Sequence, residues 1–384
     1  MDVPISRRRF LRMAGVGGVA SLTGCSRPGN AGAGTGGSTP TGIPMFRYNP
    51  ARTGGPPGTT GPTDSVTEQW AVEIDEGTAN PLLVVDETVY AWSNNRCYAL
   101  ATRDGTEQWT FETNMEVGWS PAVVDDTIYV GSRDNNVYAL AASDGTEQWR
   151  FETDSYIGLS PTVVDDTVYV GSGDGMLYAL DATNGTEQWS FNTGFGVDAS
   201  PAVVDGTVYI AGGKSAYGID AGDGTERWSF GFRYVGNATP AVVDGTVYLR
   251  HGRQIWALDA ADGTEQWSFN PDDNMLTPGT VPPAVVGDTV YAGVDDSIYA
   301  LATSDGTERW SVELDGGIRS SLAVTTDAVY AAGDDGTVYA VSTGDGTEHW
   351  QFETETRWAS PPVVADGTVY IESSDGTVYA LTEL

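Results

Sequence analysis

The sequence predicts an all-β protein, an eight-bladed β-propeller of four-stranded antiparallel blades, and three observations support this prediction. A Trp recurs with a period of about 40 residues, which is typical of repeat architectures. Each period holds four short runs rich in Val, Ile, Tyr, Trp and Phe. No segment shows a helical period. The repeated residues, expected to dock neighbouring blades, are Trp70, Trp109, Trp149, Trp189, Trp228, Trp267, Trp310 and Trp350.

One complete unit, residues 120–152, shows how a period becomes a blade. The runs "SPAVVD", "TIYVGS", "VYALAA" and "EQWRFE" read as four consecutive strands. The Asp-Asp, Asp-Asn and Asp-Gly pairs between strands supply the positive-φ residues that tight hairpins require. Four antiparallel strands that repeat in this way make a propeller blade.

The two ends of the repeat predict how the ring closes. The "YAL" strand and the Trp strand each occur eight times, but they are out of phase. The last "YAL", residues 379–381, has no Trp strand after it, and the first Trp strand, residues 68–74, has no strands of its own before it. We therefore expect the N-terminal strand to complete the last blade of a propeller that spans 65–384, which would leave no free sheet edge.

The N-terminal segment is predicted to be an export signal. "SRRRFLR" at residues 6–12, with Arg7 and Arg8, resembles a twin-arginine signal, and "LTGC" resembles a lipobox that ends in Cys25. We expect residues 1–24 to be the signal, 25–43 a flexible tether and 44–64 an extended Gly/Pro-rich lead-in. A lipid on Cys25 would anchor the protein to the outer face of the cytoplasmic membrane. Cys97 is then expected to be a core thiol without a disulfide partner.

The charge of the chain limits its partners. Lys and Arg total 19, Asp and Glu total 53, and the net charge is -34. This excess disfavours nucleic acid and anionic lipid surfaces as partners. Such an acidic, lysine-poor composition indicates a halophilic protein kept soluble in high salt, where the Debye length falls to about 3 Å at 1 M.

The run "ALDATNGTEQW", residues 179–189, resembles the tryptophan-docking repeat of the quinoprotein (PQQ) family. The resemblance covers about residues 44–384, although the Lys of that motif is Thr in every copy here. It implies an eight-bladed propeller in which each Trp lies between neighbouring blades. The family includes PQQ-dependent alcohol dehydrogenases and non-enzymatic assembly lipoproteins of the BamB type, so the resemblance leaves function open.

The inventory of reactive side chains favours binding over catalysis. The chain has two His and two Cys, which leaves too few ligands for a structural zinc site. A PQQ dehydrogenase would need an Asp base, a calcium site and rings around the cofactor, and here there is no Cys pair and the loops are short. We therefore expect a monomeric cell-surface scaffold that binds protein partners, without cofactor, metal or catalytic residues. The alternative is an alcohol or sugar dehydrogenase that uses PQQ with Ca²⁺.

The connections on one face of the predicted ring vary, whereas the "DGTE" and "VDGT" turns of the other face are uniform. Eight of the 12 cations within 65–384 map to the variable connections, where they would receive an anionic partner or simply avoid the acidic turns. Most blades end their second strand with Gly or Ala, and three break this rule. Across blades 8, 1 and 2 the aromatic and charged residues either converge in a binding site or plug the seam where the ring closes. The candidate binding residues are Trp92, Arg96, Trp119, Arg250, Arg357, Trp358 and Glu372.

Overall fold

The computed structural model describes residues 42–43, 49, 58–75, 80–197, 199–232, 238–271, 281–318, 320–354, 356 and 360–384. All of them belong to one compact unit, Gly36–Leu384. The predicted signal, Cys25, Arg357 and Trp358 lie outside the described residues. Within the described part of the chain no helix has the length and hydropathy needed to cross a bilayer.

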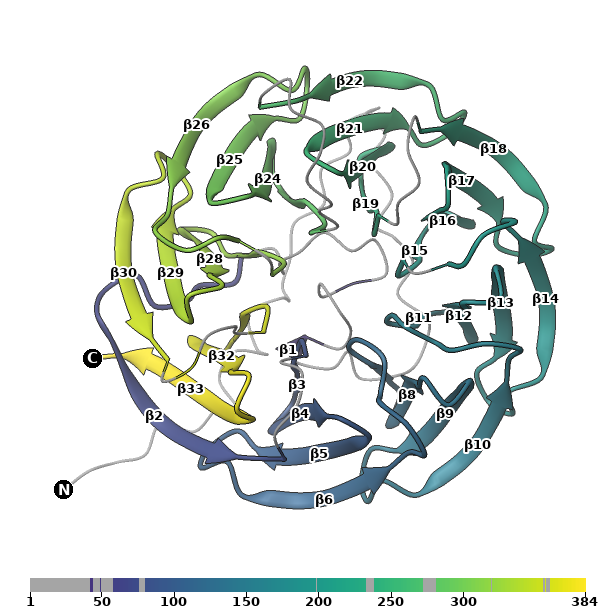
Figure 1. Cartoon of the computed structure of the whole chain (residues 1–384), viewed down its shortest axis with the longest axis horizontal. Helices are drawn as coiled ribbons and strands as arrows, with labels where there is room; N and C mark the ends of the chain where they lie inside the picture. The colour runs from purple at the N-terminus through teal and green to yellow at the C-terminus, as the bar shows by residue number, and fades with distance from the viewer. Residues whose placement is uncertain are drawn as a thin grey trace, which may run out of the picture. The chain divides into compact units, whose positions relative to one another are not determined.

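Eight antiparallel sheets are arranged around a common centre, which confirms the predicted eight-bladed propeller (Figure 1). The innermost strands of blades 1 to 8 are β3 (Leu83–Val85), β7 (Ala122–Val124), β11 (Thr162–Val164), β15 (Ala202–Val204), β19 (Ala241–Val243), β23 (Ala284–Val286), β27 (Ala323–Val324) and β31 (Val363–Ala365). The second strands are β4 (Thr88–Ser93), β8 (Thr127–Gly131), β12 (Thr167–Gly171), β16 (Thr207–Gly212), β20 (Thr246–His251), β24 (Thr289–Val294), β28 (Ala328–Ala332) and β32 (Thr368–Glu372).

The outer half of each blade carries the repeated Tyr and Trp. The third strands are β5 (Arg96–Ala101), β9 (Asn136–Ala141), β13 (Met176–Asp181), β17 (Ser215–Asp220), β21 (Gln254–Asp259), β25 (Ser297–Ala302), β29 (Thr337–Ser342) and β33 (Thr377–Glu383). The outermost strands are β6 (Glu107–Glu112), β10 (Glu147–Glu152), β14 (Glu187–Asn192), β18 (Glu226–Gly231), β22 (Glu265–Phe269), β26 (Glu308–Glu313), β30 (Glu348–Glu353) and β2 (Val66–Glu73).

The ring closes as the sequence predicts. Strand β2 pairs antiparallel with β33, with Trp70 opposite Ala380, so blade 8 joins both ends of the repeat. In Figure 1 the purple β2 lies beside the yellow β33 at the rim. At the inner edge of blade 1, β1 (Gly42–Ile43) adds a short fifth strand beside β3, in a segment that the sequence assigns to the tether.

Each repeated Trp joins its blade to the next one. The indole Nε1 of every copy donates a hydrogen bond of 2.8–3.0 Å to a carbonyl oxygen across the blade interface. In seven copies the ring also lies against the Gly of the following "DGT" or "NGT" turn. A Cβ atom added to Gly185, whose φ is +72°, would lie 2.5 Å from Trp149 Cε3. This contact explains why the motif pairs Gly with Trp.

The Trp of blade 7 uses a different hydrogen-bond acceptor. The outermost strand of blade 8 is β2, so no turn of the repeat joins it to the third strand, β33. Here Trp350 Nε1 donates to the carbonyl oxygen of Pro62 at 2.8 Å, and Tyr330 Oη donates to the same oxygen at 3.0 Å. Gly61 lies so close to Tyr330 and Val364 that a Cβ atom would clash with both. The part of the lead-in that precedes β2 therefore completes the last Trp contact of the ring.

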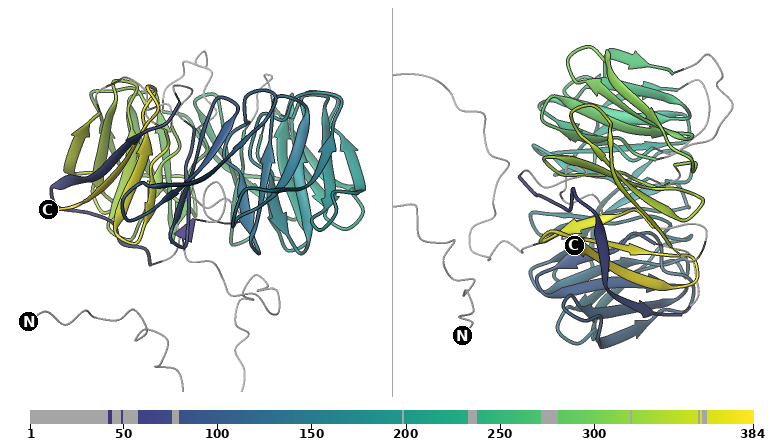
Figure 2. Two further views of the ribbon diagram at one scale, coloured as in Figure 1. Left: turned by 90° about the horizontal axis from the view of Figure 1, so that it is seen from below. Right: turned by 90° about the vertical axis from the view of Figure 1, so that its left-hand side faces the viewer.

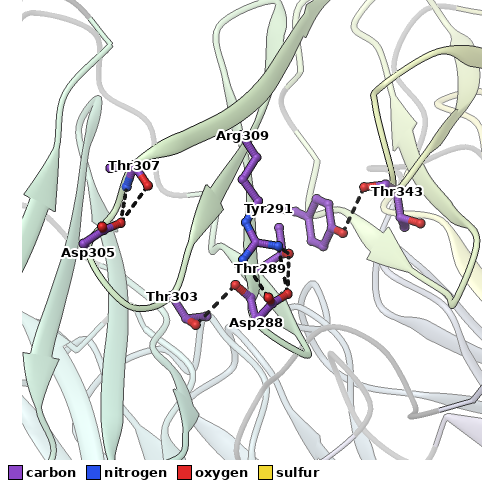
Figure 3. A network of polar contacts seen from close by, with 8 residues as sticks. All are labelled: Asp288, Thr289, Tyr291, Thr303, Asp305, Thr307, Arg309 and Thr343. Atoms are coloured by element: carbon purple, nitrogen blue, oxygen red, sulfur yellow. Dashed lines mark hydrogen bonds and ion pairs between the residues drawn. The ribbon is translucent and has the colours of Figure 1, made fainter.

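The acidic turns of the repeat are solvated hairpins. In blade 6, Asp305 Oδ1 accepts hydrogen bonds from Thr307 N at 3.0 Å and from Thr307 Oγ1 at 2.7 Å (Figure 3). These bonds lower the pKa of the Asp305 carboxyl. Beside them Arg309 binds both carboxylate oxygens of Asp288 at 2.7–2.8 Å. The Asp and Thr side chains of the motif thus form the hydrogen bonds that stabilise the turn.

Candidate binding face

The connections between strands gather at two opposite faces of the ring (Figure 2). We call the face with the Asp-Thr turns the repeat face. The variable face is formed by the turns between second and third strands and by the connections from each outermost strand to the next blade. Trp92, Arg250 and Glu372 are close to the variable face, because the second strands end there.

These three residues lie beneath the variable face rather than on it. Trp92 and Glu372 are fully buried and Arg250 is 3% exposed. Blades 2, 3 and 6 have Gly131, Gly171 and Gly293 at the same strand position, and a Cβ atom there would clash with an apolar residue of the following connection. In blades 1, 5 and 8 the same strand position holds a large or charged side chain instead of glycine, namely Trp92, Arg250 and Glu372.

Two of them lie at the seam where the ring closes. Asn80, which precedes the innermost strand of blade 1, donates from Nδ2 to the Trp92 carbonyl oxygen at 3.4 Å. Its backbone amide lies near the Glu372 carboxyl in blade 8. Both carboxyl oxygens of Glu372 and the Trp92 indole nitrogen are buried, and no described residue lies in hydrogen-bond geometry to them. Burial raises the pKa of Glu372 well above its usual value, and among the described residues the Asn80 backbone amide acts in the opposite direction without offsetting it.

Replacing Glu372 with Gln is expected to make the seam more stable at neutral and alkaline pH. The raised pKa means that the folded protein favours the protonated acid. The contribution of Glu372 to the free energy of unfolding is therefore fully present below pH 4.5, and it is lost as the pH rises from there towards the pKa of the folded state. The loss is about 1.4 kcal/mol per pH unit in that range. Melting temperatures of Glu372→Gln and of the wild type should therefore diverge as the pH rises. An exposed control, Glu313→Gln, should follow the wild type, and parallel profiles of wild type and Glu372→Gln would refute this explanation.

Three of the five described cations of the variable face are paired with carboxylates. Arg96 lies 2.9 Å from Asp75, Arg133 lies 3.3 Å from Glu116, and Arg253 forms an ion pair with Asp295. Trp119 is half-buried, and its amide donates to the Gly158 carbonyl oxygen at 3.2 Å. Lys214 is exposed. The remaining cations of this face, Arg233, Arg319 and Arg357, lie outside the described residues together with Trp358.

A row of exposed apolar side chains marks the same face over blades 1 to 4. Met115 is 54% exposed, Tyr156 is 36% exposed and Phe195 is 51% exposed. They belong to three successive connections, β6–β7, β10–β11 and β14–β15. Within the described part of the chain the other large exposed hydrophobic residue is Leu384. We call Met115, Tyr156 and Phe195 the apolar arc.

The arc is held in place by its surroundings. The Tyr156 ring packs on Gly173 and the Phe195 ring on Gly213, where added Cβ atoms would lie 2.5 Å from the ring carbons. Thr113 Oγ1 and Thr193 Oγ1 donate to the carbonyl oxygens of Met115 and Phe195 at 2.6 Å. These contacts hold two rings of the arc and the backbone at Met115 and Phe195 in position.

Sequence reasoning did not single out the arc or Asn80. The signal available was a Thr that opens each connection, Thr113, Thr153 and Thr193, followed within three residues by a large apolar side chain. A single exposed apolar residue in a loop is ordinary, so only the alignment of successive connections reveals the row.

Three features of the described residues bear on PQQ with Ca²⁺. They contain no group of three or more His, Cys, Asp or Glu side chains that could hold a metal ion. Trp92, the ring nearest to a cofactor role, is buried among apolar residues of blades 1, 2 and 8. Cys97 is a buried free thiol.

Comparison with protein families gives one decisive match. The family model described as "Outer membrane protein assembly factor BamB" matches residues 93–194, 192–296 and 294–384, which is most of the chain. The chain belongs to this family. Comparison with curated proteins gives no match.

Solved structures share the fold of this BamB-family chain. BamB from Moraxella catarrhalis is 19% identical, with a TM-score of 0.68 over 83% of this chain and 100% of that one. A europium-containing methanol dehydrogenase is 14% identical, with a TM-score of 0.77 over 89% of this chain and 98% of that one. The computationally designed Ika8 protein is 18% identical, with a TM-score of 0.73 over 82% of this chain and 98% of that one. At these identities the likeness concerns the fold alone.

Proposed function

We propose that this BamB-family propeller is a non-catalytic scaffold that binds a protein partner through its variable face. The export signal and Cys25 are proposed to anchor it by lipid to the outer face of the cytoplasmic membrane. Its partner is then another protein of the cell surface. The observation that carries the proposal is the apolar arc.

The arc has the composition of a protein-binding hot spot. Met, Tyr, Phe and Arg are enriched at the centres of protein interfaces. Beside the arc, the Arg133 guanidinium lies 5.9 Å from the Tyr156 ring centroid. Lys214, the single lysine of the chain, follows the glycine on which the Phe195 ring packs. An apolar row between cations suits a partner with apolar side chains flanked by carboxylates.

Capture of surface proteins by two double variants tests the proposal. Tyr156→Ser with Phe195→Ser removes two rings of the arc, whereas Gln108→Ser with Gln148→Ser changes two exposed residues of the outermost strands. We expect the wild type and the Gln double variant to retain a common partner. The ring double variant should lose at least about tenfold in affinity for it, or about 1.4 kcal/mol, at an unchanged melting temperature. Equal capture by both double variants would contradict the proposal.

A further inference from the structure

Arg250 is a buried cation that has no counterion among the residues the structure describes. It lies in β20 of blade 5, across the ring from blade 1 (Figure 1), and is 3% exposed. Its Nε and Nη1 atoms are buried, and the described part of the chain offers them no hydrogen-bond acceptor. Burial, together with the charge of Arg253, lowers its pKa to about 10, so the side chain is still charged at neutral pH.

The neighbouring charges do not compensate Arg250. Arg253 is paired with Asp295 of blade 6, which leaves this pair neutral. The side chains of the pair are 17% and 30% exposed, so it lies closer to the surface than Arg250 does. The His251 ring is stacked on Phe232 at 4.6 Å, and burial lowers its pKa. Among these four described side chains the charges therefore sum to one buried positive charge, in a chain whose net charge is -34.

Packing does not require a large side chain at this position. Five blades place a small residue there, namely Gly131, Gly171, Ala211, Gly293 and Ala332. An isolated buried charge costs several kcal/mol unless it is paired. Its donors would therefore be satisfied best by a ligand that brings the missing negative charge.

We propose that Arg250 is the centre of a site for a small oxyanion, a carboxylate or a phosphate, beneath the variable face at blade 5. A guanidinium binds such groups through two parallel hydrogen bonds, and the low dielectric of a buried site strengthens them. Arg253, held by Asp295, lies close enough to add attraction to the bound anion. The site is separate from the apolar arc of blades 1 to 4, and it does not rest on the protein-binding proposal.

Thermal shift and calorimetric titrations with inorganic phosphate and with succinate test this site, at constant chloride and constant ionic strength. We expect at least one of the two anions to raise the wild-type melting temperature in a saturable way. Arg250→Met keeps the length of the side chain but removes its charge, and it should lose at least tenfold in affinity. Arg150→Met, on an exposed outermost strand, removes one charge elsewhere and should bind like the wild type.

The same variants separate a ligand site from a structural role. Without added anion Arg250→Met should melt at or above the wild-type temperature, because an unpaired buried charge has been removed. Arg250→Lys keeps the charge without the paired donors, and it should fold with weakened binding even if Arg250→Met does not fold. Absence of saturable binding in the wild type, or equal binding by wild type and the foldable Arg250 variant, would overturn the proposal. A response to phosphate alone or succinate alone would identify the class of anion.

Discussion

Deleting residues 58–75 is expected to prevent the propeller from folding. Strand β2 supplies the outermost strand of blade 8, where it is in register with β33 from Val66 to Glu73. Trp70 Nε1 donates to the Thr102 carbonyl oxygen of blade 1, and Pro62 provides the acceptor for Trp350 of blade 7. The deletion would thus remove one strand and two Trp contacts, and would expose the edge of β33.

Circular dichroism and size-exclusion chromatography measure this effect. Deleting residues 1–35 is the control, because it leaves the compact unit Gly36–Leu384 intact. The control should remain soluble and melt cooperatively, whereas the 58–75 deletion should aggregate or lack a cooperative transition. A monomeric 58–75 deletion with a wild-type melting curve would show that the seam is unimportant for closure.

Truncating a docking Trp is expected to cause the largest loss from a single substitution. Trp149 is buried between blades 2 and 3, with its Nε1 bonded to the Ala182 carbonyl oxygen at 2.9 Å. Trp149→Ala should lower the free energy of unfolding by about 3–5 kcal/mol, through lost burial and the cavity that remains. Denaturant titration followed by far-UV circular dichroism gives this value.

A double-mutant cycle with Gly185 isolates the contact itself. Gly185→Ala adds a methyl group that clashes with the Trp149 ring, and it also strains a backbone with φ +72°. Gly206→Ala is the matched control, because Gly206 has φ +69° and open space around the added atom, so it should cost only about 1–2 kcal/mol. Gly185→Ala should cost more than Gly206→Ala in the wild type and the same in Trp149→Ala. Strict additivity of Trp149→Ala and Gly185→Ala would rule out the proposed contact.

The fold could be predicted because the sequence pattern of one blade recurs many times along the chain. Eight Trp strands and eight "YAL" strands counted out of phase give the blade number and the closing pair. The role of Pro62 could not be predicted, because it acts through a backbone carbonyl group and no side-chain pattern marks it. Its position against Trp350 depends on how the ends of the chain meet in space.

The candidate site was only partly predictable. Departure from the repeat identified Trp92, Arg250 and Glu372 as unusual, and all three are among the described residues with unpaired buried polar atoms. Their burial beneath the variable face could not be predicted, because the alternation of side chains along a strand does not show which connection covers the end of that strand. Two rings of the apolar arc pack on Gly173 and Gly213, and in the sequence those glycines look like ordinary turn residues.

Titration of the purified protein with PQQ and Ca²⁺ tests most directly whether this propeller works by binding rather than by catalysis. The protein is expected to leave the absorbance of the added quinone unchanged and to reduce no dye in the presence of alcohols or sugars. Stoichiometric uptake of PQQ with dye reduction that depends on substrate would contradict the scaffold function and assign the chain to the quinoprotein dehydrogenases.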